Sequence, residues 1–266
     1  MSVIHAIILG VVQGVAEFLP ISSSGHLVVL QRVFGFNEPS LTFDIVVHLG
    51  SFVAVVAVFR KDILALIKKP VQKMTGLLII GTLPAVAAGL FLRSHIEGFF
   101  RSGIPLAVAF IATGVFLMLA DRFKPGAKTE NEITYADALV VGLMQAVGIP
   151  PGVSRSGATI TGALSRGIER KAAARFSFLL AVIAIAGAGA LEGIEIITGG
   201  VSVVSGDIIP MAVGFVTSAV VGYFSVRLLL KLIEACKLKY FSFYVWALAV
   251  LIIADAVILN LFFDYM

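Results

Sequence analysis

The chain has 266 residues, of which 59% are hydrophobic and only 14% charged, and its mean hydropathy is +1.04. A water-soluble domain of this length does not bury so much apolar surface, whereas membrane helices need it on their lipid-facing sides as well. The lone Cys236 excludes an internal disulfide. We therefore expect an all-α polytopic membrane protein with a single membrane domain over residues 1–266.

Residues 1–36 predict a re-entrant helix–loop–helix rather than a span. A short apolar run precedes a turn-rich core at 17–26, a second short run follows it, and neither arm is long enough to cross a bilayer comfortably. The N-terminus lacks the basic region of a secretory signal peptide, so we expect it to be retained as structure. The core holds the polar residues Glu17, Ser22, Ser23, Ser24 and His26.

The rest of the chain predicts six spans and a second hairpin. The third and fourth spans are separated by the polar stretch 124–132 and by residues 133–168, which again consist of two short arms around a turn-rich core. This core, 149–159, holds Ser154, Arg155, Ser156 and Thr159. The spans are the apolar stretches at roughly 43–59, 76–92, 104–120, 173–197, 208–232 and 241–263.

The basic residues indicate the orientation of these spans. Sixteen of the twenty Lys and Arg residues fall in four clusters at span ends, within 60–73, 122–128, 166–175 and 227–239. Placing the clusters in the cytoplasm satisfies the positive-inside rule with both termini outside. The net charge of +4 is therefore an orientation signal, and nucleic acid is not an expected partner.

Short matches at a spacing of 132 residues indicate an internal repeat. Gln13 aligns with Gln145 and Gly10 with Gly142, and the same spacing superimposes the two turn-rich cores. Each half holds one hairpin and three spans, so the second copy is inverted and the two hairpin tips meet near the membrane midplane. The predicted units are repeat 1 at about 1–123, a linker at about 124–132 and repeat 2 at about 133–266.

The two turn-rich cores predict a phosphate site. Ionisable groups at membrane depth are costly, so Glu17, His26 and Arg155 require an explanation. Arg155 offers a planar fork of donors to phosphate oxygens, and hydroxyls and N–H groups at two helix starts add more donors. Ser23 and His26 are three residues apart and share a face if a helix begins there, which permits histidine to activate a serine nucleophile.

Several of these residues also have a structural interpretation. Arg155 can be a counter-ion to Glu17 that joins the two hairpins, and Gln13 can simply hydrogen-bond across helices. His48 and Asp44, one turn apart in the first span, either line the pocket or lie at the membrane interface.

Three further residues, Ser22, Ser24 and Asp255, have no firm assignment from the sequence. Ser22 and Ser24 are as much helix-packing residues as phosphate ligands. Asp255, in the last predicted span, has no obvious partner. Trp246 is expected to anchor the chain at a membrane interface.

Both cores closely resemble the motifs of the bacterial undecaprenyl-diphosphate phosphatase family, also called the bacitracin-resistance family. The first carries Gln13-Gly-Val-Ala-Glu17 followed by Pro20-Ile-Ser-Ser-Ser-Gly-His26, and the second carries Pro151-Gly-Val-Ser-Arg-Ser-Gly-Ala-Thr159. The helix pattern agrees over nearly the whole chain. Some members carry glutamate at the position of Gln13, which leaves Glu17 as the stronger candidate for a charged role here.

The resemblance implies hydrolysis of a polyprenyl diphosphate lipid, undecaprenyl diphosphate, to its monophosphate and inorganic phosphate in the bacterial cytoplasmic (inner) membrane. This reaction recycles the lipid carrier of cell-wall synthesis and confers bacitracin resistance. A divalent cation, Mg²⁺ or Ca²⁺, is implied, with Glu17 and Gln13 as its protein contacts. The implied catalytic residues are Glu17, Ser23, His26 and Arg155, and the implied phosphate-binding residues are Ser22, Ser24, Ser154, Arg155, Ser156 and Thr159.

Some alternatives stay open at this point. The nucleophile is Ser23, His26 or water, and a homodimer is compatible with the sequence. A transporter or flippase of a polyprenyl phosphate lipid is the main rival, because inverted repeats with re-entrant loops are typical of carriers. A carrier does not need Ser23 and His26 beside Glu17, which favours the enzyme. A non-catalytic lipid-binding or assembly protein does not explain so many polar groups at membrane depth.

Overall fold

The computed structural model of the chain describes residues 1–36, 41–96, 103–124, 126–197, 208–235, 237–259 and 261–263. Throughout these residues the fold is helical, with one isolated bridge between Lys128 and Ile168 and no strand. Five helices are long and apolar enough to cross a membrane, or six if a bent pair counts as one span. This confirms the predicted all-α polytopic membrane fold.

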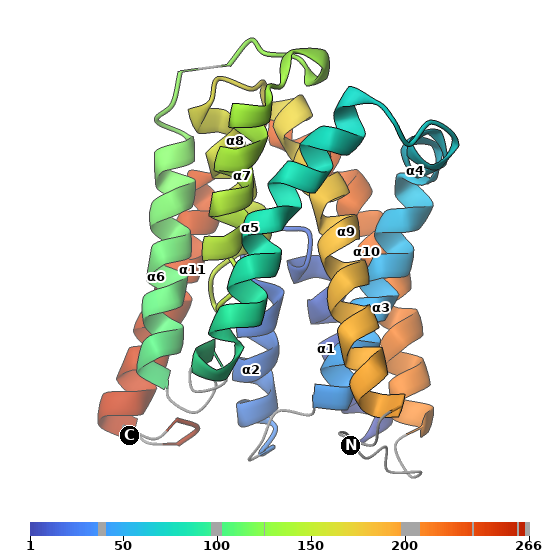
Figure 1. The fold of residues 1–266 in the computed structure, drawn as a ribbon. Helices are drawn as coiled ribbons and strands as arrows, with labels where there is room; N and C mark the ends of the chain where they lie inside the picture. Colours follow the sequence, from blue (N-terminus) through green and yellow to red (C-terminus); the bar gives the residue numbers. More distant parts are fainter. Residues whose placement is uncertain are drawn as a thin grey trace.

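The first hairpin consists of α1 (Val3–Ala16) and α2 (Ser23–Val33), which leave and return to the same end of the molecule (Figure 1). Each helix starts with a serine cap: Ser2 accepts from the N–H of His5, and Ser22 accepts from the N–H of Gly25. Ser22 has φ of 69°, a left-handed conformation that non-glycine residues rarely adopt. This sharp turn lets α2 begin at Ser23 and reverse the chain.

The second hairpin consists of α7 (Tyr135–Val147) and α8 (Arg155–Ser165), and it enters from the opposite end (Figure 1). Thr134 and Asp137 form a capping box at the start of α7, and Ser154 caps α8 by accepting from the N–H of Gly157. Neither arm reaches the length of a span. The predicted hairpins at 1–36 and 133–168 are therefore present.

The span-length helices pack around the two hairpins. The 3₁₀ helix η2 (Glu130–Glu132) precedes the second hairpin, and the π-helical turn η4 (Asp255–Leu259) ends the last span. The helical segment that contains the first predicted span runs beyond it: the chain bends by 77° after Val58 and continues as the short helix α4 (Arg60–Lys68). The remaining helices are α3 (Leu41–Val58), α4 (Arg60–Lys68), α5 (Lys73–Ile96), α6 (Gly103–Ala120), α9 (Arg170–Ile197), α10 (Ile208–Ala235) and α11 (Lys239–Ala254).

The four basic clusters gather at one end of the bundle, opposite the end where α1 begins and η4 ends (Figure 1). Ion pairs tie the clusters to carboxylates there: Arg170 lies 2.6 Å from Asp121. Arg166 and Lys128 lie 2.9 and 3.0 Å from the fully buried Asp137. The separation of charge between the two ends is the pattern that the positive-inside rule requires.

Glycines let each hairpin pack closely against a span from the other half of the chain. A Cβ built on Gly10 of α1 would lie 2.8 Å from the carbonyl oxygen of Gly214 in α10. A Cβ built on Gly142 of α7 would lie 2.5 Å from the carbonyl oxygen of Gly81 in α5. Any larger side chain at these positions would push the backbones apart.

Asp255, which the sequence left without a partner, and Trp246, which it predicted as an interfacial anchor, both have defined partners in the structure. The Asp255 carboxylate accepts the backbone N–H groups of Leu261, Phe262 and Phe263, so it ends the last helix. Trp246 packs against Gly114 of α6 and donates its indole N–H to the carbonyl of Ile111, 3.1 Å away. It therefore joins α11 to α6.

Candidate active site

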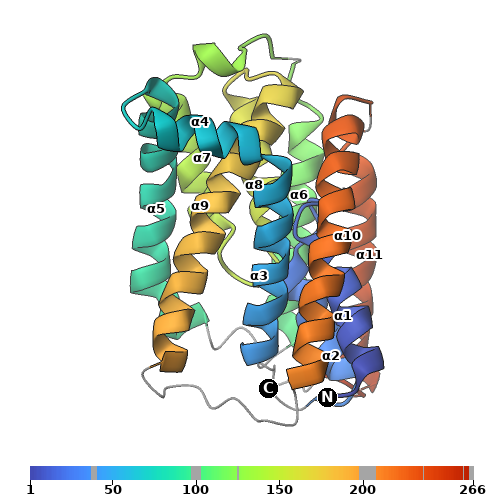
Figure 2. The same ribbon diagram turned by 90° about the vertical axis from the view of Figure 1, so that its right-hand side faces the viewer.

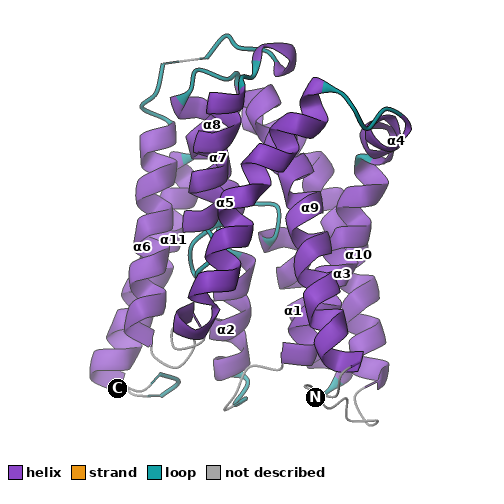
Figure 3. Cartoon of the chain, in the orientation of Figure 1, coloured by secondary structure: helices purple, strands orange, loops and turns teal. Residues whose placement is uncertain are grey.

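The loops of the two hairpins meet in the interior of the bundle (Figure 3). Arg155 Nη2 in the second loop lies 2.6 Å from Glu17 Oε1 in the first. Ser156 Oγ donates to the carbonyl of Leu19, 3.2 Å away. These contacts join the interior loops of two hairpins whose helices enter from opposite ends of the molecule (Figure 1).

Glu17 is the centre of this cluster. Its Oε2 accepts from Ser23 Oγ at 2.5 Å and from Gln13 Nε2 at 3.1 Å, and His48 Nε2 lies 3.6 Å away. The residue is 8% exposed, so its charge depends on these donors and on Arg155 for compensation. The ion pair considered as a structural alternative for Arg155 is thus present. It holds Arg155 beside the candidate nucleophile Ser23, so the two interpretations are compatible.

His26 does not face Ser23 in this structure. Its Nδ1 lies 2.6 Å from the carbonyl oxygen of Ser22, which can only accept, so Nδ1 carries the proton. Its Nε2 then accepts from the hydroxyl of Tyr244 at 2.8 Å, and the two rings are stacked. Ser23 and His26 both start α2, but Ser23 is hydrogen-bonded to Glu17 rather than to His26.

The predicted phosphate ligands of the second loop are engaged within the protein. Ser154 Oγ caps α8 by accepting from the N–H of Gly157, and it lies 3.2 Å from Ser156 Oγ. Thr159 Oγ1 lies 2.6 Å from Ser177 Oγ and donates to the carbonyl of Arg155 at 2.9 Å. In this state the hydroxyls shape the loop and the start of α8, and Arg155 carries the charge.

The first loop shows a similar division of roles. Ser22 Oγ caps α2 and lies 3.5 Å from Ser24 Oγ. Gly25 is closely packed, since a Cβ built on it would lie 2.9 Å from the Cα of Gly152 in the other loop. The serines on either side of Ser23 therefore fix the turn that aims Ser23 at Glu17.

The surroundings of Glu17 suit a hard cation only with ligands from a substrate. Among the described residues, no group of three His, Cys, Asp or Glu side chains could hold a metal ion. Gln13 donates to Glu17 and to Ser51, as its structural interpretation expected, but its Oε1 is buried with no partner. One carboxylate and one free amide oxygen fit a Mg²⁺ or Ca²⁺ ion that completes its shell with water and phosphate oxygens.

Sequence reasoning missed two members of the cluster. Tyr244 lies in α11, 218 positions from its partner His26, and no local motif marks it. Ser51 of α3 accepts from Gln13 and lies 3.1 Å from Ser218 of α10. His48, which the sequence placed either in the pocket or at the interface, lies beside Glu17.

Helices long and apolar enough to span a membrane, which enclose a carboxylate, a serine hydroxyl, an imidazole and a guanidinium, define an integral membrane protein with a polar site in its interior. The chain belongs to the family described as "Bacitracin resistance protein BacA", whose profile matches residues 6–251. It is similar to undecaprenyl-diphosphatase of Carboxydothermus hydrogenoformans, with 46% identity over 95% of this chain and 97% of that protein. It is 41% identical to undecaprenyl-diphosphatase 3 of Bacillus cereus, over 95% of this chain and 97% of that protein. It is also 41% identical to undecaprenyl-diphosphatase of Geobacter sulfurreducens, over 92% of this chain and 94% of that protein.

Proposed function

We propose that this chain is an undecaprenyl-diphosphatase of the bacterial cytoplasmic membrane. It hydrolyses undecaprenyl diphosphate to undecaprenyl phosphate and inorganic phosphate, which recycles the lipid carrier of cell-wall synthesis and confers bacitracin resistance. One observation carries the proposal: the Ser23 hydroxyl donates to a Glu17 carboxylate that is itself paired with Arg155. A nucleophile, a proton acceptor and a phosphate-binding cation thus lie in one buried cluster.

The proposed reaction begins when the terminal phosphate of the lipid takes over the guanidinium of Arg155. Ser23 Oγ attacks the terminal phosphorus and its proton passes to Glu17 Oε2, the atom it already contacts. The bond from this phosphorus to the bridging oxygen breaks, and the lipid monophosphate leaves with that oxygen. Water then attacks the phosphorus of the phosphoserine and the bond from phosphorus to Ser23 Oγ breaks. The water oxygen and its protons leave with inorganic phosphate, and the proton held by Glu17 returns to Ser23 Oγ.

Glu17 replaces His26 as the proposed base in the first step. His26 can accept the proton of Ser23 only after its Nε2 has left the hydroxyl of Tyr244 and the serine has turned away from Glu17. The geometry therefore supports Glu17 as the first proton acceptor and gives His26 the task of orienting the loop through the Ser22 carbonyl.

A divalent cation belongs to the proposal. Glu17 and Gln13 would hold it, since Gln13 contacts Glu17 through Nε2 and its amide oxygen Oε1 is buried without a hydrogen-bond partner. When bound, such an ion would neutralise negative charge on the diphosphate.

The internal repeat is also part of the proposal, with a single membrane domain and a linker at about 124–132. The close contacts between α1 and α10 and between α7 and α5 support it. Gly10 is equivalent to Gly142 at the spacing of 132, and Gly81 is equivalent to Gly214 one residue out of register. Each hairpin thus packs against the equivalent span of the other half, as expected for two inverted copies that are intertwined.

Phosphate release by the purified chain tests the enzyme. Undecaprenyl or farnesyl diphosphate is supplied with Mg²⁺, with and without EDTA, to wild type, Ser23→Ala, Arg155→Ala and the control Ser165→Ala, whose hydroxyl bonds only its own helix. We expect metal-dependent release that Ser23→Ala and Arg155→Ala abolish and Ser165→Ala retains. A folded wild-type protein that releases no phosphate from either lipid would refute the phosphatase and favour the flippase.

A further inference from the structure

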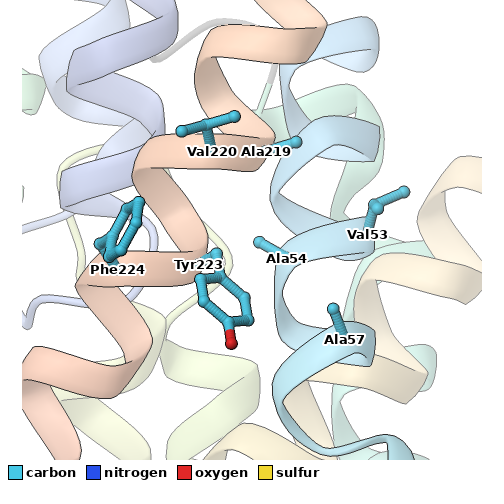
Figure 4. Close-up of a pocket in the computed structure, with 7 residues that line it drawn as sticks. All are labelled: Val53, Ala54, Ala57, Ala219, Val220, Tyr223 and Phe224. Atoms are coloured by element: carbon cyan, nitrogen blue, oxygen red, sulfur yellow. The ribbon is translucent and has the colours of Figure 1, made fainter.

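A groove between α3 and α10 lies outside the candidate active site. Its volume is about 290 Å³, and its lining is apolar apart from the hydroxyl of Tyr223. The small side chains of Ala54, Ala57 and Ala219 form its floor, and Val53, Val220 and Phe224 flank it (Figure 4). Val220 and Phe224 are 52% and 63% exposed, so the groove opens to the lipid. Its shape and chemistry suit a hydrocarbon chain.

A second hollow of about 250 Å³ continues the groove and is strongly basic. It shares Ala57 and Tyr223 with the groove, and Arg60, Lys61 and Arg227 line it. Its carboxylate, Asp62, is already held by Arg175 at 2.6 Å. Among the residues that the structure describes, Arg60 and Lys61 have no ion-pair partner. The hollow therefore presents uncompensated positive charge at the end of an apolar groove.

The position of α4 places this junction at a membrane surface. The helix leaves α3 with a bend of 77° and runs across the ends of the spans (Figure 2). Leu64 and Ile67 on it are 52% and 68% exposed, while Arg60, Lys61 and Lys68 supply its charge. An amphipathic helix of this composition lies in the plane of the interface. The distribution of basic residues assigns this end to the cytoplasmic leaflet, which carries the anionic lipids.

We propose that the groove between α3 and α10 and the basic hollow beside it form a binding site for one anionic phospholipid of the cytoplasmic leaflet. An acyl chain occupies the groove, and the headgroup phosphate lies between Arg60, Lys61 and Arg227. Arg227 is oriented by its partner Tyr223: its Nη1 lies 3.2 Å from the hydroxyl and its Cζ 5.5 Å from the ring centroid. The apolar groove and the cations together fit a lipid rather than free phosphate or an apolar protein helix, each of which would satisfy only half of the site.

Lipid titrations of the purified full-length chain in neutral detergent micelles test the site. Binding is measured by the rise in melting temperature and by native mass spectrometry with phosphatidylglycerol, with phosphatidylcholine of the same acyl chains, or with inorganic phosphate. We expect only phosphatidylglycerol to raise the melting temperature and to be retained as a one-to-one complex. Arg60→Gln/Lys61→Gln should weaken its binding about 20- to 30-fold, because two charges near the headgroup are lost.

Matched variants separate this site from general surface charge. Lys68→Gln/Lys69→Gln removes the same charge at the far end of α4 and should leave the binding constant for phosphatidylglycerol within about twofold of wild type. Ala57→Phe should fill the groove and weaken binding while all three cations remain. Val220→Ser places a polar hydroxyl on the lipid-exposed flank of the groove and should also weaken binding, with little risk to folding.

Five results would overturn the site. Equal weakening of phosphatidylglycerol binding by Arg60→Gln/Lys61→Gln and by Lys68→Gln/Lys69→Gln would mean that the positive charge of this region attracts anionic lipid without a defined site. A rise in melting temperature with inorganic phosphate equal to that with phosphatidylglycerol would show that the groove is not needed for binding. An equal rise with phosphatidylcholine would show that the basic hollow is not needed. Wild-type affinity in Arg60→Gln/Lys61→Gln would show that the headgroup lies elsewhere. Wild-type affinity in both Ala57→Phe and Val220→Ser would show that the acyl chain does not lie in the groove.

Discussion

Arg155 Nη2 lies 2.6 Å from Glu17 Oε1, although the two residues are 138 positions apart and belong to hairpins that enter from opposite ends of the bundle. Each charge lies at a depth where it is costly alone, so each compensates the burial of the other. The same pair places the guanidinium that we propose binds phosphate beside the carboxylate that accepts from Ser23. The contact that joins the hairpins is thus also the contact that assembles the candidate active site.

This pairing predicts a partial rescue of stability without rescue of activity. Arg155→Gln leaves Glu17 buried without its counter-ion and should lower the free energy of unfolding by about 3 kcal/mol. The double variant Glu17→Gln/Arg155→Gln removes both charges and should regain more than half of that loss, while both variants stay inactive. Unfolding in SDS-containing mixed micelles and phosphate release measure the two effects. If the loss of unfolding free energy in the double variant equalled the sum of the losses in Glu17→Gln and Arg155→Gln, the pairing would be contradicted.

The contacts of Ser23 and His26 predict different effects for the two candidate bases. Glu17→Gln removes the acceptor of the Ser23 proton and should lower kcat by about 10²- to 10⁴-fold. Tyr244→Phe removes only the donor to His26 Nε2 and should lower kcat less than tenfold, within the range of one lost hydrogen bond. Single-turnover phosphate release compares them. If Tyr244→Phe were as damaging as Glu17→Gln, His26 would have to act directly in the first step.

The free amide oxygen of Gln13 predicts how the dependence on the cation changes. Gln13→Glu adds a carboxylate beside Glu17 and should lower the Mg²⁺ concentration for half-maximal activity several-fold, because affinity for hard cations rises with the charge of the ligands. Gln13→Leu should raise it. Titration of EDTA-treated protein with Mg²⁺ gives both values, and Ser165→Ala serves as the control. Identical metal dependence in all variants would exclude Gln13 from the cation site.

The Asp137 network predicts a stabilising role away from the site. Its fully buried carboxylate accepts from Lys128, Arg166 and Thr134, so Asp137→Asn should lower the free energy of unfolding by about 3 kcal/mol. Asp62→Asn breaks a pair whose side chains are 35% and 34% exposed, and it should cost about 1 kcal/mol or less. Unfolding in mixed micelles compares them. Similar losses in both variants would show that burial does not decide the strength of these pairs.

The sequence by itself determined the parts of the fold that depend on local length and charge. Apolar runs long enough for a bilayer predicted the spans, the two short-armed segments predicted the hairpins, and the clusters of Lys and Arg predicted which ends lie together. The motif residues from Glu17 to His26 and from Ser154 to Thr159 also marked the two loops that meet. Each of these features is readable from neighbouring residues, because hydrophobic length and helix capping are local properties.

Only the tertiary structure decided which side chains are partners within the site. The spacing of Ser23 and His26 was compatible with a direct contact, but the turn at Ser22 directs Ser23 to Glu17 and leaves His26 to Tyr244. The bend that lays α4 along the surface was likewise absent from the hydropathy pattern. Contacts between residues 138 or 218 positions apart depend on how whole helices pack, and the close approach of small residues between helices sets that packing.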